Sequence, residues 1–99
     1  MAVVEWTDQA LEDLDTNAAF IARDSHYYAK IFVSRILSSV EQLVDFPEIG
    51  RGVPEVSQAD IREIIHGNYR IIYQYRESNS LVTILTIYHS ARILTPESL

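Results

Sequence analysis

The sequence predicts a single α+β domain in which an antiparallel helical hairpin packs on a sheet, with elements in the order β-α-α-β-β-β. Residues 7–46 carry two apolar stripes at spacings of three and four residues, which are typical of amphipathic helices. Residues 61–94 contain three runs rich in β-branched and aromatic residues, separated by turn-forming residues, which are typical of strands. A chain of 99 residues suits one domain, so we assign residues 1–99 to it.

The first strand is expected at Val3 to Trp6, a short β-prone run, and the first helix follows it directly. Thr7 is a suitable N-cap, and Asp8 puts a negative charge in the first turn, where the helix dipole stabilises it. The apolar face of this helix consists of Leu11, Leu14, Ala18, Ile21 and Ala22. The acidic face carries Glu12, Asp13 and Asp15. We interpret the acidic face as solvated rather than as a metal site, because no histidine stands at ligand spacing from it.

The second helix is expected to begin after Ser25, a good N-cap, and to end before Pro47, which prevents further helix. Its apolar stripe consists of Ala29, Phe32, Val33, Ile36, Leu37, Val40, Leu43 and Val44. Because the break between the two helices is short, they should form an antiparallel hairpin. A coiled-coil seam is the less favoured interpretation, since the stripe is too short. The prolines and glycines of residues 47–54 predict a long loop.

Three strands should follow, at Arg62 to His66, Tyr69 to Arg76 and Leu81 to Tyr88. Gly67-Asn68 accepts positive φ and should form the first hairpin turn. Hairpin turns make these three strands sequential and antiparallel neighbours. The first strand of the chain could join beside an outer strand or between two others, and the sequence leaves that choice open.

Composition bounds the class of protein. The chain has no cysteine, which excludes disulfide and thiolate chemistry and suits a reducing cytosol. Its first residues lack the basic head and long apolar run of a signal peptide, and no apolar run approaches the ~20 residues that span a bilayer. We therefore expect a soluble cytoplasmic protein without a membrane partner.

The net charge of −6 is unevenly distributed. Residues 1–48 carry nine acids and three bases, a balance of −6, whereas residues 49–99 carry five acids and five arginines, which cancel. Nonspecific binding of nucleic acid requires a broad basic field. The chain does not supply one, so we expect no direct DNA binding, although a site for a single phosphate remains possible.

Arg70 and His89 are the residues best placed for chemistry. Alternation along Tyr69 to Arg76 puts Arg70 on the face opposite an apolar Tyr/Ile face, which should meet the helices. Arg70 is either an ordinary exposed strand arginine, paired with Glu63 across the hairpin, or a clamp for a phosphate or a partner carboxylate. His89, at the end of the last strand, is either a general acid, a role that histidine often takes in catalysis, or a surface group. No metal-ligand spacing or glycine-rich phosphate loop occurs, so we expect no metal and no cofactor.

Several motifs together resemble a known family. They are Trp6, Ala10, Asp13-Leu14, Ile21-Ala22, Phe46-Pro47-Glu48-Ile49-Gly50-Arg51, Pro54-Glu55, Ile61-Arg62-Glu63, Gly67-Asn68-Tyr69-Arg70-Ile71-Ile72-Tyr73, Ile84-Leu85 and His89-Ser90-Ala91-Arg92. This pattern resembles the RelE/ParE superfamily of type II toxin–antitoxin toxins, also called plasmid stabilisation proteins. The resemblance covers nearly the whole chain. It implies a helical hairpin on a twisted antiparallel sheet, and a growth-inhibiting toxin neutralised by a cognate antitoxin.

The superfamily has two activities. RelE-like members cleave messenger RNA in the ribosome, and ParE-like members inhibit DNA gyrase. If this protein is a metal-independent ribonuclease, the resemblance implies that Glu55 is the base, Arg70 the clamp on the phosphorane charge and His89 the acid. We favour the ParE-like branch, because the C-terminal tyrosine and the lysine-rich surface of ribonuclease members are absent, Lys30 being the only lysine.

The remaining expectations concern partners. The antitoxin should supply an extended segment with an amphipathic helix, which covers the helical hairpin or adds to a sheet edge. Its contacts should concentrate on an arginine-bearing outer face of the sheet, for which the sequence offers Arg51, Arg62, Arg70 and Arg92, with His89 beside them. A third hypothesis, from a different class, is a non-toxic binding module that keeps only the fold and the antitoxin groove.

Overall fold

The computed structural model describes residues 1–91. Its elements are β1 (Val3–Trp6), α1 (Asp8–Ala22), α2 (His26–Glu41), a 3₁₀ turn η1 (Gln42–Val44), β2 (Arg51–Gly52), β3 (Ile61–His66), β4 (Tyr69–Arg76), a 3₁₀ turn η2 (Glu77–Asn79) and β5 (Leu81–His89). The predicted order is confirmed, and β2 is an addition to it: two residues of the expected loop pair with Arg62 and Glu63 at the edge of the sheet.

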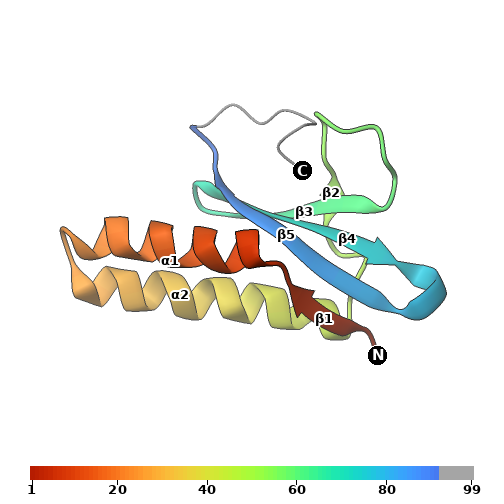
Figure 1. Ribbon diagram of the computed structural model, residues 1–99, viewed down its shortest axis with the longest axis horizontal. Helices are drawn as coiled ribbons and strands as arrows, with labels where there is room; N and C mark the ends of the chain where they lie inside the picture. The colour runs from red at the N-terminus through yellow and green to blue at the C-terminus, as the bar shows by residue number, and fades with distance from the viewer. Residues whose placement is uncertain (92–99) are drawn as a thin grey trace.

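Both helices begin where the sequence indicates. The Thr7 hydroxyl accepts a hydrogen bond from the Ala10 N–H (3.0 Å), and the Ser25 hydroxyl accepts one from the Tyr28 N–H (3.2 Å). Each cap satisfies an N–H that has no partner within its own helix. The two helices lie side by side as a hairpin (Figure 1).

The five strands form one sheet in the order β1-β5-β4-β3-β2. Neighbouring strands from β5 to β2 are antiparallel, as expected. However, β1 pairs in parallel with β5, from Val3 opposite Leu81 to Trp6 opposite Ile84. The sheet is therefore mixed, and the open question of the first strand is decided: it lies beside the last one. A parallel pair requires a long crossover, and the rest of the chain between β1 and β5, helices included, supplies it.

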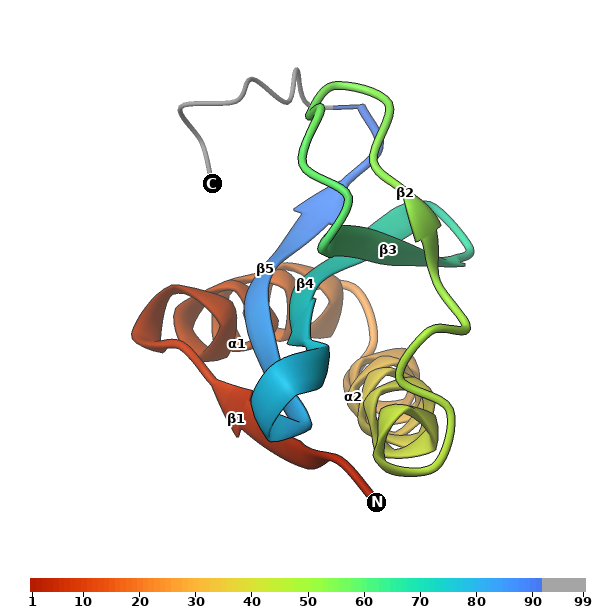
Figure 2. The ribbon, with the colours of Figure 1, turned by 90° about the vertical axis from the view of Figure 1, so that its right-hand side faces the viewer.

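The main core lies between the helices and one face of the sheet (Figure 2). Its buried members include Ala10 and Leu14 of α1, Phe32, Ile36 and Val40 of α2, and Ile71, Tyr73, Val82, Ile84 and Ile87 of the sheet. The prediction that the Tyr/Ile face of β4 meets the helices is confirmed. A smaller cluster of Val53, Ile61 and Ile72 lies apart from the main core, where the loop between β2 and β3 covers the sheet.

Two details of α1 differ from the sequence prediction. Leu11 is 47 % exposed, because Ala10 and Leu14 are the residues that point into the core. Asp13 is not on a purely solvated face: its carboxylate accepts hydrogen bonds from the Thr86 hydroxyl and from the Ile87 N–H (3.2 Å). The reason is that β1 pairs with β5 only as far as Ile84, so α1 satisfies a backbone donor on the edge that β1 leaves open.

Candidate functional site

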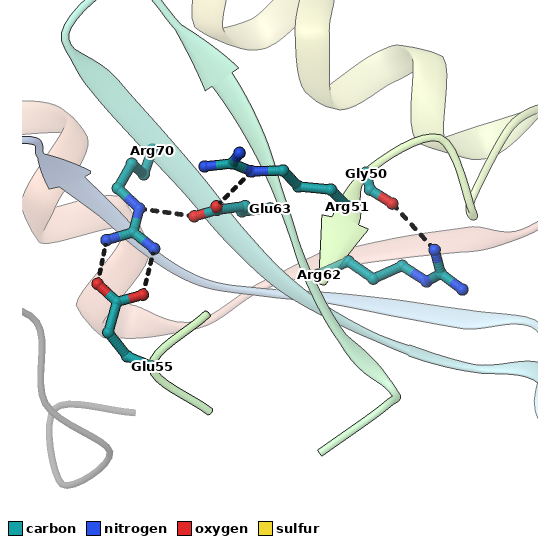
Figure 3. A network of polar contacts seen from close by, with 6 residues as sticks. All are labelled: Gly50, Arg51, Glu55, Arg62, Glu63 and Arg70. Carbon is teal, nitrogen blue, oxygen red and sulfur yellow. Dashed lines mark hydrogen bonds and ion pairs between the residues drawn. The ribbon is translucent and has the colours of Figure 1, made fainter. Parts of the chain in front are cut away.

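The outer face of β4 carries a guanidinium held at three points. Arg70 Nε donates to Glu63 Oε1 at 2.6 Å, while Nη1 and Nη2 donate to the two oxygens of Glu55 at 2.8 Å each (Figure 3). Two parallel bonds between a guanidinium and a carboxylate form the strongest geometry open to such a pair. The Arg70 side chain is only 13 % exposed, so it is not a freely solvated strand arginine.

Glu63 is the anchor of this network. Its side chain is fully buried beside Ile72 of the neighbouring strand, and its second oxygen accepts a hydrogen bond from Arg51 Nε at 2.8 Å. A buried carboxylate is tolerated only when it is paired and hydrogen-bonded. Here Arg51 of β2 and Arg70 of β4 approach it from two sides. The expected pairing of Arg70 with Glu63 is thus confirmed, the expected exposure of Arg70 is wrong, and Glu55 is a second partner.

The electrostatics of the pair follow from its geometry. The hydrogen bonds from Arg70 lower the pKa of Glu55 from its ordinary 4.5 to about 2, and partial burial opposes that shift. In turn, the hydrogen bonds to Glu55 raise the pKa of Arg70 above its already high ordinary value. Glu55 and Arg70 are therefore both ionised at neutral pH, and their opposite charges cancel.

Arg62 does not belong to this surface, although we expected it there. It stands opposite Tyr73 in the register of β3 and β4, one residue out of phase with Glu63, and so points to the helix-facing side. Its guanidinium donates to the carbonyls of Glu48 (3.2 Å) and Gly50 (2.9 Å), as Figure 3 shows for the latter. Arg62 therefore fixes the loop that precedes β2.

Tyr73 fixes the same loop from the core. Its buried hydroxyl donates to the Pro47 carbonyl (2.8 Å) and accepts from the Gly50 N–H (2.9 Å). Burial raises the pKa of the Tyr73 hydroxyl. A Cβ at Gly50 would lie 2.6 Å from that hydroxyl and 2.7 Å from the Glu63 carbonyl, so only glycine fits this approach. The loop thus reaches β2, and with it Arg51, in one defined position.

His89 also lies apart from Arg70, and the expectation that the two share a face is wrong. His89 stands opposite Tyr69, whereas the partner of Arg70 is Tyr88. The imidazole packs edge-on against Tyr69 with ring centroids 5.0 Å apart, and its Nδ1 accepts from the Ala91 N–H at 3.1 Å. Tyr69 in turn packs on Phe32 of α2, so His89 belongs to the helix side.

Of the candidate residues, the structure therefore brings together Arg51, Glu55 and Arg70, and it adds Glu63 as their centre. It separates Arg62 and His89 from them. Arg92 lies outside the described residues. Alternation along the last strand was the signal that could have found Tyr88 as the neighbour of Arg70, because His89 follows it and must point the other way.

The outer surface of the helical hairpin carries an open groove of about 600 Å³. Alanines and apolar side chains form much of its wall, among them Ala18, Ala22, Ala29, Val33 and Leu37. Small residues allow another helix to approach closely, so the groove suits an amphipathic partner segment. Within residues 1–91, no group of three or more acidic or histidine side chains could hold a metal ion. In the same range no helix has the length and apolar character needed to cross a membrane.

Comparison with known proteins identifies relatives that match most of the chain. A family described as the ParE toxin of the type II toxin–antitoxin system parDE matches residues 4–94. Toxin RelE2 of Caulobacter vibrioides is 32 % identical over 93 residues, which cover 94 % of this chain and 100 % of the relative. The fold is similar to a chain of the chromosomal ParDE system of P. aeruginosa, with a TM-score of 0.72 and 21 % identity over 90 % of this chain and 96 % of that one. It is also similar to a chain of the RelBE2 complex of Mycobacterium tuberculosis, with a TM-score of 0.65 and 20 % identity over 89 % and 96 %.

Proposed function

This chain belongs to the ParE toxin family of type II toxin–antitoxin systems, and from that premise we propose that it arrests growth by binding and inhibiting DNA gyrase. A cognate antitoxin neutralises it by occupying the toxin surface. The protein acts by contact between proteins and not by cleaving a substrate. Its site of action is the cytoplasm, where gyrase works on the chromosome.

The separation of His89 from Arg70 is the observation that carries this proposal. Cleavage of RNA through its 2′-hydroxyl needs a base, an acid and a charge clamp around one phosphate. Here the Arg70 guanidinium lies on the outer face, whereas the imidazole of His89 packs with Tyr69 on the helix side. A phosphate bound to Arg70 would have no imidazole facing its leaving oxygen.

The state of Glu55 supports the same conclusion. A general base works best when its pKa lies near the working pH. Arg70 holds the pKa of Glu55 at about 2, so this carboxylate attracts a proton only weakly at neutral pH. Both of its oxygens are also engaged by Arg70, and would have to leave that pair before reaching a hydroxyl.

Net charge supports a protein target as well. A chain of net charge −6 repels an extended polyanion, whereas a protein surface can be matched locally. The arginines of the outer face, Arg51 and Arg70, already balance two carboxylates. They therefore offer directional hydrogen bonds rather than a basic field.

A ribosome-dependent ribonuclease is the second candidate. It is favoured by the name of the Caulobacter relative, a RelE toxin, and by the contact between Glu55 and Arg70. This candidate requires His89 to reach the outer face when the toxin binds its target. It predicts codon-specific cuts in translated messages, which disappear in Arg70→Ala.

The antitoxin half of the proposal is supported by the groove on the helical hairpin and by the neighbours in fold, which come from toxin–antitoxin complexes. An amphipathic helix of the antitoxin fills the groove with its apolar side chains. An extended segment of the same antitoxin continues across the sheet.

The direct test is gyrase supercoiling in the presence of the purified toxin. We expect inhibition at micromolar toxin, and full activity when the toxin is first mixed with its antitoxin, which serves as the matched control. Messages from induced cells, mapped in parallel for new 5′ ends, should remain intact. Normal supercoiling together with cut messages would replace the proposal by the ribonuclease. Growth without arrest on expression of the toxin alone would indicate a binding module.

A further inference from the structure

A buried contact fixes the orientation of the Arg70 guanidinium. Glu63 binds Nε from a fully buried position and is itself fixed by Arg51. The Arg70 side chain is mostly buried, so its rotamer is set before any partner arrives. Nη1 and Nη2 remain as a planar pair of donors that point away from Glu63 (Figure 3). We call this pair of donors the Arg70 fork. Because its orientation is fixed in advance, the fork binds a carboxylate with little loss of side-chain entropy.

Glu55, which occupies the Arg70 fork in this structure, lies on a loop and not on a strand. Glu55 stands on the irregular loop between β2 and β3, and its side chain is 34 % exposed, in contrast to the buried Glu63. Within the loop, a backbone hydrogen bond from the Val56 N–H to the Val53 carbonyl (3.1 Å) spans the position of Glu55. Glu55 can therefore swing away from Arg70 without breaking a bond of the sheet.

The fork opens into a hollow of about 260 Å³, which gives a second side chain room to approach it. Its wall includes Arg51, Ile65, Asn68 and Ser90 besides the ion pair itself. Ile65 is 48 % exposed and offers an apolar contact at the rim, while Asn68 and Ser90 carry polar groups. The hollow thus combines an apolar side chain with polar and charged groups, the mixture that binding pockets commonly show.

We propose that the Arg70 fork is a carboxylate-binding site, that Glu55 occupies it in the free toxin, and that an Asp or Glu side chain of the antitoxin replaces Glu55 on binding. Glu55 is then an internal competitor that lowers the apparent affinity for the antitoxin. The inference rests on the antitoxin half of the proposed function and is independent of the gyrase target.

Charge favours a carboxylate over a phosphate dianion as the replacement. When Glu55 leaves, two arginines and one glutamate remain, so the site has one uncompensated positive charge. A carboxylate carries the single negative charge that restores the balance, and its planar pair of oxygens matches the fork. A phosphate dianion would leave an excess negative charge within a chain that already carries −6.

The first test asks whether the fork binds a free carboxylate. In Glu55→Ala the fork is empty, so acetate should shift the Arg70 side-chain ¹⁵N–¹H signals saturably. Wild-type protein, in which Glu55 fills the fork, should respond more weakly at the same acetate concentration. Sodium chloride at equal ionic strength is the control for screening. Inorganic phosphate should compete less well than acetate.

The second test measures the affinity of the antitoxin for toxin variants. Glu55→Gln removes the competing charge, so the affinity of the antitoxin for this toxin variant should rise about fivefold. This is the size expected when an exposed ion pair no longer has to be broken before binding. Glu77→Gln, on the distant turn η2, makes the same change in net charge and should leave affinity unchanged. Arg70→Lys keeps the charge but not the planar fork, and should weaken the complex.

Specific outcomes would overturn the inference. Unchanged or weaker antitoxin binding by Glu55→Gln would show that Glu55 does not compete. Equal shifts with acetate and chloride, or a stronger response to phosphate, would exclude a carboxylate site. Tighter binding of a short RNA to Glu55→Gln, without tighter antitoxin binding, would assign the fork to nucleic acid. If no antitoxin binds any variant, the proposed function fails, and the acetate titration still decides whether the fork is a carboxylate site.

Discussion

Replacing the buried Glu63 by glutamine should destabilise the protein strongly. Glu63 accepts charged donors on both oxygens, from Arg70 at 2.6 Å and from Arg51 at 2.8 Å. Glutamine has the same shape but only one acceptor, so its NH₂ group must face one of the two arginines. The substitution therefore removes one charge-assisted hydrogen bond and the negative charge that both guanidinium groups share.

The size of this loss depends on how exposed the two arginines are. Breaking a buried ion pair costs about 3–5 kcal/mol when the remaining charge has no other partner. The Arg51 side chain is 64 % exposed, so water can solvate its guanidinium after the substitution, and Arg51 contributes little to the lost stability. Arg70 is 13 % exposed but retains Glu55, which reduces its share. We therefore expect a loss of about 2–3 kcal/mol in the free energy of unfolding, or a fall in Tm of roughly 10–20 °C for a domain of this size.

Urea unfolding at pH 7 measures this loss directly, and Trp6 is the single tryptophan that reports it. The dependence on urea should keep its slope, because the surface exposed on unfolding does not change. Glu77→Gln is the matched control on an exposed turn, where a change within about 0.5 kcal/mol is expected. A loss below about 1 kcal/mol in Glu63→Gln would contradict this prediction, since it would mean that the desolvation cost of the buried carboxylate offsets the hydrogen bonds that it accepts.

Two further predictions concern the loops that frame the site. Tyr73→Phe should lower the free energy of unfolding in urea by about 2 kcal/mol, because it leaves the Gly50 N–H and the Pro47 carbonyl without their hydrogen-bond partner. A loss near zero would show that the loop repacks. Glu55→Gln should reduce the free energy of unfolding by only about 1 kcal/mol at pH 7, because Glu55 is a third exposed and solvent screens its pair with Arg70. The folded-state pKa of Glu55 is lowered from 4.5 to about 2, so the stabilisation by its pair with Arg70 is fully present above pH 4.5 and is lost as the pH falls toward 2. Unfolding of wild type and variant between pH 7 and pH 2 should therefore converge, and a difference that persists at pH 2 would contradict the assignment.

Much of the fold follows from local signals in the sequence. The caps at Thr7 and Ser25 and the turn at Gly67 act within a few residues, so their patterns can be interpreted without the rest of the chain. The alternation of Tyr69 to Arg76 likewise determined that Tyr73 is core and that Arg70 is on the opposite face. A strand of period two has only two faces, so one buried set fixes the other.

Which side chains of neighbouring strands share a face of the sheet could not be predicted in the same way. Assigning Arg62 and His89 to the face of Arg70 required the pairing of β3, β4 and β5, and a shift by one residue reverses a side chain. The strands also carry an irregularity between Ile72 and Tyr73, which changes the register along their length. The arginines of residues 49–99 thus indicated a recognition surface, but the sequence did not show which of them lie on the same face of the sheet.

Residue patterns along the chain were enough to predict the class of fold, the helix starts and the family, because these depend on residues within single elements. The tertiary structure decided that β1 lies parallel to β5, that Glu63 is buried between Arg51 and Arg70, and that Glu55 occupies the Arg70 fork. Those contacts join residues from strands and loops whose spacing along the chain has no fixed relation to their distance in space. Only the packing of the sheet and the β2–β3 loop brings them within hydrogen-bond range.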